Sequence, residues 1–233
     1  KKAFYIAATG RPGPVVVDIP KDVFTETGEF EYPETVNLPG YRPVQEGHPS
    51  QVRKAAKLIA EAQRPLILAG HGVILSRAYE EVRQLAEKGQ IPVITTLLGL
   101  SSFPATHYLC VGMPWMHGAA FASLAIHEAD LLIALGMRFD DRVTGKVSAF
   151  APNAQVVHVD IDPAEISKNV KATVPIVGDV RRVLQQLLPL LPQKTRPEWL
   201  ARVDQLRQEH PLRARESEKL IPQYVIQQLS EVT

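Results

Sequence analysis

Residues 66–72 are Leu66-Ile67-Leu68-Ala69-Gly70-His71-Gly72, and residues 92–96 are Pro92-Val93-Ile94-Thr95-Thr96. Both contain short apolar runs bounded by glycine or proline, which is typical of buried strands. Between them, apolar side chains recur on one helical face at positions 78, 82, 85 and 86. A strand, a helix and a second strand in this order predict a βαβ unit with two parallel strands.

The same alternation continues along the chain. Helical patterns begin near Ser50 and Gly118 and again after residue 179, and apolar runs at 131–135, 156–159 and 175–177 predict further strands. Strands that are apolar throughout need cover on both faces. We therefore predict an α/β fold: a doubly wound, Rossmann-like parallel sheet of about six strands with helices on both faces.

The flanking segments have a different character. Residues 15–19, Val15-Val16-Val17-Asp18-Ile19, predict one more buried strand. Prolines recur without any period over 25–47, which indicates a linker. Beyond Pro192, helical patterns surround Trp199 and follow Pro222. We expect an excised piece of a longer protein: the end of one domain at 1–24, a complete domain at 48–191, and a linker helix with the start of a third domain at 192–233.

The composition favours a soluble globular protein, with 45% apolar and 22% charged residues in 233. The formal net charge of +1 gives no electrostatic footprint for nucleic acid or anionic lipid, so neither is an expected partner. No stretch approaches the roughly 18 apolar residues that span a membrane. The single cysteine, Cys110, cannot form an internal disulfide. We expect a cytoplasmic location, or an organelle if a targeting segment was removed.

Ligands of doubly wound sheets bind beyond the carboxyl ends of the strands. Gly70-His71-Gly72 follows the first predicted strand, where glycine allows a backbone to approach a phosphate. The standard dinucleotide fingerprint is not met, because Leu75 stands where a third glycine is required. A plain tight turn explains the two glycines equally well.

Charged residues follow the later strands. The loop from Gly136 to Gly145 carries Arg138, Asp140, Asp141 and Arg142, which could clamp a pyrophosphate or form a surface salt-bridge cluster.

Asp160, Asp162 and Asp179 could accept hydrogen bonds from a ribose, although Asp162 and Asp179 could equally cap helices. Met116 and His117 could wall a flat ring system, or pack as ordinary core and loop residues. No motif identifies a nucleophile or a metal site, so we assign no catalytic and no metal-binding residue.

Several stretches together resemble the acetolactate (acetohydroxyacid) synthase catalytic subunit, a thiamine-diphosphate enzyme. They are Gly10 to Val15 with Asp18 to Asp22, Thr95 to Leu97 with Gly99-Leu100 and Phe103-Pro104, Trp115 to Gly118, Gly136 to Gly145, and His158 to Ile166. The resemblance implies an N-terminal pyrimidine-binding domain, a central FAD-binding domain and a C-terminal pyrophosphate-binding domain. The chain would hold the second of these, between parts of the other two.

The resemblance also implies particular site residues. The FAD contacts would be Arg11, Gly70, His71, Gly72, Thr96, Leu97, Met116, His117, Gly136, Arg138, Asp140, Arg142, Val143, Asp160, Ile161 and Asp179. Positions matching a substrate channel blocked by sulfonylurea-type herbicides would be Lys21, Met116, Asp141 and Arg142. His71 and Leu98 depart from the family pattern, which has a small and a polar residue there.

The intact enzyme would decarboxylate pyruvate and join the product to a second 2-keto acid, with thiamine diphosphate as the electron sink. The activating glutamate and the Gly-Asp-Gly motif for Mg²⁺ would lie in the other two domains, so we expect this chain alone to be inactive. The resemblance implies a homodimer or homotetramer and a regulatory small subunit. Alternatives are the central domain of another thiamine enzyme, such as pyruvate oxidase or glyoxylate carboligase, and a standalone flavin-binding module.

Overall fold

A six-stranded parallel sheet forms the centre of the computed structural model, which describes residues 1–212 and 220–232. Its strands are β1 (Pro65–Ala69), β2 (Val93–Thr95), β3 (Cys110–Gly112), β4 (Leu131–Leu135), β5 (Gln155–Asp160) and β6 (Val174–Val177). The order β3-β2-β1-β4-β5-β6 reverses direction between β1 and β4, which creates a topological switch point. The predicted fold class is confirmed.

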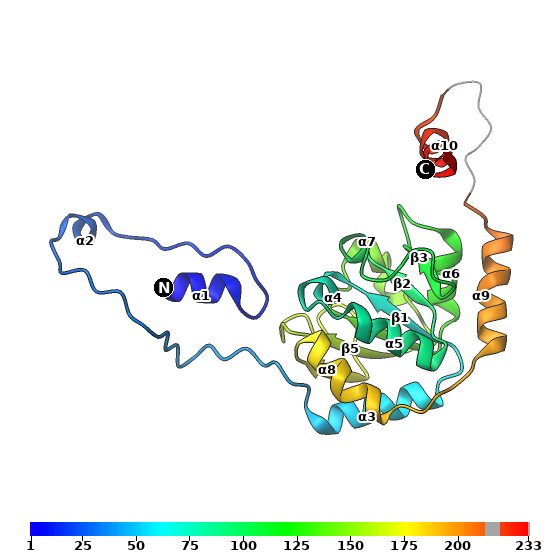
Figure 1. The fold of residues 1–233 in the computed structure, drawn as a ribbon, viewed down its shortest axis with the longest axis horizontal. Helices are drawn as coiled ribbons and strands as arrows, with labels where there is room; N and C mark the ends of the chain where they lie inside the picture. Colours follow the sequence, from blue (N-terminus) through cyan, green and yellow to red (C-terminus); the bar gives the residue numbers. More distant parts are fainter. Residues whose placement is uncertain (213–219, 233) are drawn as a thin grey trace.

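Helices cover both faces of the sheet (Figure 1). The helices α3 (Pro49–Glu61), α5 (Tyr79–Gly89) and α8 (Val180–Leu187) pack on strand residues such as Ile67 and Ile133. We call this side the α3 face. The helices α6 (Ala120–Glu128) and α9 (Pro197–Glu209) pack on the alternate residues, such as Leu66 and Leu132. We call that side the α6 face. Successive strand side chains point to opposite faces, so two cores share one sheet.

Helix α9, which the sequence analysis assigned to a linker, packs tightly on the α6 face. Trp199, Val203 and Leu206 are buried there, each at most 3% exposed. The Trp199 indole Nε1 donates a hydrogen bond to the carbonyl of Pro65, at 2.9 Å. The helix therefore contributes its apolar side to the same core as α6.

Arg196 holds the segment that leads into α9. Its side chain is buried, at 4% exposure. The guanidinium donates to the carbonyls of Ile59 (2.6 Å), Ala62 (3.2 Å) and Gly89, which lie at the ends of α3 and α5. Cations at helix C-termini complement the unpaired carbonyls and the helix dipole. Burial lowers the pKa of Arg196, so these carbonyls stabilise a charge that desolvation disfavours.

Strand β3 and several short helices were not predicted. Strand β3 consists of Cys110, Val111 and Gly112, of which only Val111 is β-branched, so its sequence gives little sign of a strand. It pairs with β2 in an irregular register. The helices α4 (His71–Leu75) and α7 (Asp141–Thr144) are too short to show a period. Both begin in loops that follow strands, so they shape the edge at which the strands end.

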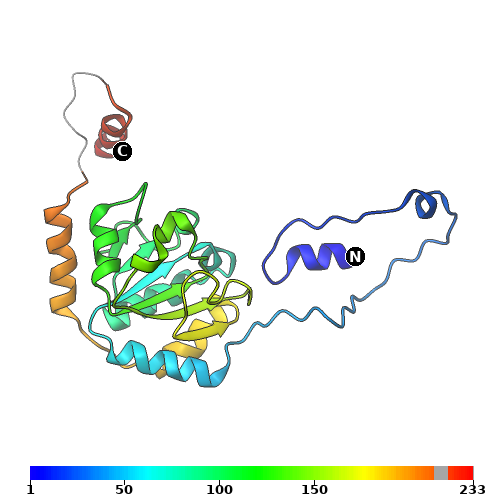
Figure 2. The same ribbon diagram turned by 180° about the vertical axis from the view of Figure 1, so that it is seen from behind.

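The prediction of a buried strand over 15–19 was wrong. These residues form no strand, and Val16 is 90% exposed. A strand requires a hydrogen-bonded neighbour, and none of the described segments pairs with this run. It lies between α1 (Lys2–Ala8) and α2 (Lys21–Thr25), which Figures 1 and 2 show apart from the sheet.

Residues 26–47 contain neither helix nor strand, as a linker would. Near the other end of the chain, α10 (Pro222–Val232) forms the predicted helix after Pro222. Within the described ranges, the helices fall short of the length and apolar character that crossing a bilayer requires.

Candidate functional site

The predicted site residues fall largely along one edge of the sheet, where all six parallel strands end. We call it the carboxyl edge. In spatial order it carries Met116 and His117 after β3, Thr96 and Leu97 after β2, Gly70, His71 and Gly72 after β1, the residues from Gly136 to Val143 after β4, Asp160 and Ile161 at β5, and Asp179 after β6. The row crosses the switch point between β1 and β4, the usual place of ligands in such sheets.

Three glycines bring two loops into contact at the switch point. The amides of Gly70 and Gly72 donate to the carbonyls of Leu135 and Gly136, both at 2.9 Å. A Cβ on Gly70 would lie 2.3 Å from the Gly136 carbonyl oxygen. One on Gly136, whose φ is +57°, would lie 2.5 Å from the Gly72 Cα. Close backbone packing alone therefore requires these glycines, and two of their amides are already paired.

The loop after β4 carries its charges on the surface. The Arg138 side chain is 54% exposed and lies 3.5 Å from an Asp140 carboxylate oxygen. Arg142 is 67% exposed and lies 4.0 Å from Asp141. Its Nη1 also approaches the Met116 sulfur, at 3.6 Å. Exposed pairs at such distances contribute little free energy, so both guanidinium groups remain accessible to an anion.

Asp140 and Val143 shape this loop. The Asp140 carboxylate accepts a hydrogen bond from the Val143 amide, at 3.2 Å, and caps α7. Val143 itself packs against the core of the α6 face.

Asp160 is a buried carboxylate at the end of β5, with 7% exposure. One oxygen, Oδ1, accepts a hydrogen bond from the Asp162 amide, at 2.9 Å. The other oxygen has no hydrogen-bond donor within the described ranges. Burial raises the pKa of Asp160, and the nearby carboxylates of Asp162 and Glu165 add to this while Arg11 opposes it. The ionised form is therefore costly in the ligand-free protein.

We expect Asp160→Asn to raise the thermal unfolding temperature of the ligand-free chain at neutral pH. The pKa of Asp160 is higher in the folded state than in the unfolded chain, so its stabilising contribution is lost as the pH rises through the folded pKa. The amide removes the charge and keeps the oxygen that accepts from Asp162. Calorimetry at pH 7.5 and pH 4 checks this. The rise in unfolding temperature caused by the substitution should be smaller at pH 4, and a variant that unfolds at the same or a lower temperature than the unaltered chain at pH 7.5 contradicts the prediction.

Arg11 reaches the loop after β5 from the N-terminal segment. Its Nη1 lies 3.1 Å from Asp162 and 2.8 Å from Glu165. Glu165 is 8% exposed, and no sequence motif marks it as a site residue. Asp162 also accepts from the Ala164 amide, at 2.9 Å. The loop thus places Arg11 beside Asp160, where its positive charge favours the ionised carboxylate.

The remaining candidates lie near by. Asp179 caps α8 by accepting from the Arg182 amide, at 3.1 Å, and Ile161 is partly buried after Asp160. Leu97 is 65% exposed next to Thr96. His71 Nδ1 lies 3.0 Å from the Leu98 carbonyl oxygen, so the two positions that depart from the family pattern contact each other.

A strained turn presents Met116 and His117. Trp115 has a φ of +67°, which is unusual for a non-glycine residue and occurs at functional sites. Its amide donates to Ser123 Oγ, at 2.8 Å, and its carbonyl accepts from the Gly118 amide, also at 2.8 Å. Because the Trp115 ring packs on the α6 face, Met116 is left 65% exposed.

Lys21 is not brought to the carboxyl edge. It begins α2 and is exposed, and α2 lies far from the sheet in both views (Figures 1 and 2).

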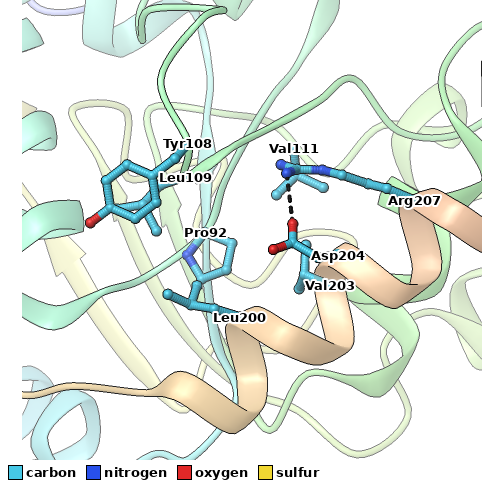
Figure 3. A pocket seen from close by; sticks show the side chains of 8 residues that line it. All are labelled: Pro92, Tyr108, Leu109, Val111, Leu200, Val203, Asp204 and Arg207. Atoms are coloured by element: carbon cyan, nitrogen blue, oxygen red, sulfur yellow. Dashed lines mark hydrogen bonds and ion pairs between the residues drawn. The ribbon is translucent and has the colours of Figure 1, made fainter.

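A pocket of about 210 Å³ also lies away from the row, between α9 and the β2 and β3 strands (Figure 3). Its lining contains none of the predicted site residues: Pro92, Tyr108, Leu109, Val111, Leu200, Val203, Asp204 and Arg207. Its two charged groups are paired: Arg207 lies 2.9 Å from Asp204 and also donates to the Cys110 carbonyl.

The carboxyl edge suits an extended dinucleotide such as FAD. It offers a buried carboxylate for a ribose, exposed guanidinium groups for phosphates, and exposed apolar side chains at Leu97 and Met116 for a ring. These acceptor, donor and apolar groups match the ribose, the phosphates and the ring of such a cofactor.

Comparison with known proteins identifies the class. A family model described as "Thiamine pyrophosphate enzyme, central domain" matches residues 52–187. The chain belongs to the thiamine pyrophosphate enzyme family, through its central domain.

Similar proteins are named as acetolactate synthases. The chain is 50% identical over 241 residues to the probable acetolactate synthase large subunit of Methanocaldococcus jannaschii, which covers 100% of this chain and 40% of that protein. It is 49% identical to the acetolactate synthase of Mycobacterium bovis, over 99% of this chain and 39% of that protein. It is 48% identical to the acetolactate synthase large subunit of Corynebacterium glutamicum, over 99% of this chain and 38% of that protein. The chain thus spans about two fifths of the length of these relatives.

Proposed function

We propose that this chain is the FAD-binding central part of an acetolactate synthase. The adenosine half of FAD would lie over the ends of β5 and β6, near Asp160 and Asp179. The flavin ring would lie toward Met116 and His117, and Arg138 and Arg142 would pair with the pyrophosphate or line a substrate channel. The order of these residues along the carboxyl edge supports this arrangement.

The observation that carries the proposal is the Asp160 carboxylate. The Asp160 side chain is largely buried and burial raises its pKa, yet its second oxygen has no donor within the described ranges and is not enclosed, so it is open to a ligand. Two ribose hydroxyls would supply the missing donors.

Titration of the chain with FAD, followed by flavin fluorescence, tests the proposal. We expect saturable binding, and Asp160→Ala should weaken it by about 1–3 kcal/mol, because a charge-assisted hydrogen bond is lost. Asp204→Ala, which removes an exposed carboxylate from α9, is the matched control. An unchanged dissociation constant in the Asp160 variant removes the ribose assignment, and no binding by the unaltered chain removes the proposal.

Arg138→Lys and Arg142→Lys should each weaken FAD binding several-fold, or alter turnover of the full-length enzyme. A lysine keeps the charge but loses the planar fork that pairs with a phosphate in two places. Arg53→Lys, on the exposed side of α3, is the control. If both site variants match the unaltered protein in affinity and kinetics, the charges form only a surface cluster.

The relatives are named for the synthesis of acetolactate, and the resemblance implies pyruvate and a second 2-keto acid as substrates of the full-length protein. Thiamine diphosphate would supply the electron sink, and the parts that the resemblance implies for holding it and Mg²⁺ would lie outside these residues.

We therefore expect the 233-residue chain to form no acetolactate from pyruvate, even with FAD, thiamine diphosphate and Mg²⁺ supplied. Positioning the reacting groups contributes several kcal/mol to catalysis, and both domains that the resemblance implies for positioning thiamine diphosphate would be incomplete in this chain. A discontinuous acetoin assay beside a full-length relative measures it. Turnover above the blank without protein means that catalytic groups lie within these residues.

We also propose the partners that the resemblance implies: the flanking domains of the same protein, further copies of it in a homodimer or homotetramer, and a regulatory small subunit. A cytoplasmic location and synthesis of branched-chain amino acids complete the proposal. Mass measurement of the full-length protein by light scattering tests the oligomeric state.

A further inference from the structure

The backbone around Arg138 is held from both sides. Met137 and Phe139 are 4% and 3% exposed, and both side chains enter the core of the α6 face. Arg138 lies between them and points its guanidinium outward, with 54% of its side chain exposed. Two buried neighbours therefore fix the direction in which this one arginine leaves the sheet.

Side-chain donors bind the carbonyls on both sides of Arg138. The Met137 carbonyl accepts from His158 Nε2, at 2.9 Å. The Phe139 carbonyl accepts from Asn169 Nδ2, at 2.8 Å. His158 lies on β5 and Asn169 in the loop after it, so the strand that carries Asp160 also holds the loop that carries Arg138.

His158 has a single tautomer that fits. It is fully buried, and a carbonyl can only accept, so Nε2 carries the proton. Its Nδ1 is buried without a hydrogen-bond partner. Such an unsatisfied atom costs free energy, and a leucine or phenylalanine would avoid that cost. The Phe139 ring and the imidazole meet in a T-shaped contact, with centroids 5.1 Å apart and planes at 80°. The hydrogen bond to the loop, and not packing in the core, therefore explains a histidine at this position.

We propose that His158 and Asn169 are positioning residues for Arg138, which hold its backbone so that the guanidinium faces the pyrophosphate of the cofactor. This inference rests on the proposed FAD binding. Neither residue needs to touch the cofactor, because each binds the main-chain carbonyl of a residue that adjoins Arg138, either Met137 or Phe139.

A double-mutant cycle tests the inference in the 233-residue chain. Asn169 is exposed, so Asn169→Ala and Asn169→Asp remove the donor without opening a core. We expect each to raise the dissociation constant of FAD roughly three- to tenfold. In an Arg138→Ala background the same substitution should change it less than twofold, because residues that act through one group are not additive. Asn153→Ala, in the exposed loop before β5, is the matched control.

Hydrogen exchange of the cofactor-free chain gives a second measurement. Asn169→Asp should speed exchange of the amides of residues 138–140, whereas those of β1 should stay as slow as before. His158→Gln, which can still donate, should disturb this loop less than His158→Phe. Equal effects of Asn169→Ala with and without Arg138 overturn the inference, and so does unchanged exchange. If the unaltered chain binds no FAD, the proposed function fails and the exchange result alone decides whether the loop is held.

Discussion

Replacing Arg196 with methionine should lower the free energy of unfolding by about 3 kcal/mol or more, a large part of a domain's total stability. Methionine fills similar space but donates nothing, so the buried carbonyls of Ile59 and Gly89 lose their charged donor, whereas that of Ala62 still accepts from Lys194. Each buried acceptor left without a partner costs about 1–3 kcal/mol. Urea denaturation followed by tryptophan fluorescence measures the change.

Two controls separate the buried donor from the loss of charge. Arg53→Met removes an exposed arginine from α3 and should change stability by less than about 0.5 kcal/mol. Arg196→Lys keeps the charge, but its single ammonium does not match the fork of a guanidinium, so an intermediate loss is expected. Equal stability of Arg196→Met and the unaltered chain contradicts the role given to this residue.

Gly136→Ala should destabilise the domain by about 2–6 kcal/mol and prevent FAD binding. A positive φ costs an alanine about 1–3 kcal/mol, and forcing an atom into a packed site adds about 1–3 kcal/mol. The new Cβ would lie 2.5 Å from the Gly72 Cα. Because the obstacle is backbone, no rotamer change relieves it.

Gly145→Ala isolates the steric part of this effect. Gly145 has a similar φ of +56°, but the nearest atom to its Cβ would be 3.9 Å away, in the Trp115 ring. Its substitution should therefore cost only the backbone strain. Chemical denaturation of both variants measures the difference, and equal losses would show that the two loops at the switch point can separate freely.

The sheet could be predicted because its central strands have a strong signal. Residues 131–135 are apolar throughout, and the pattern also marks β1 and β5. Strand β3 gave no such signal, since its pairing with β2 depends on neighbours supplied by the tertiary fold. The same reasoning misled at 15–19, where β-branched residues favour a strand but nothing within the described ranges pairs with them.

The site could be predicted in outline for a related reason. Parallel strands end at one edge, so residues that follow different strands must meet there. The partners of these residues were not predictable. Glu165 meets Arg11, and Asn169 meets the Phe139 carbonyl, only because of how the irregular loop after β5 folds. The positive φ of Trp115 also leaves no trace in the sequence, since no glycine marks it.

The exposed run at 15–19 affects how this chain behaves in concentrated solution. Three successive valines with unpaired backbone groups form a template on which another molecule could build an intermolecular ladder. Three residues oppose such intermolecular pairing: Asp18 places a charge within the run, and Pro14 and Pro20, which lack an N–H donor, stand at its two ends. These residues limit self-association to short contacts. The colloidal stability of the chain thus depends on Pro14, Asp18 and Pro20, which lie outside the core.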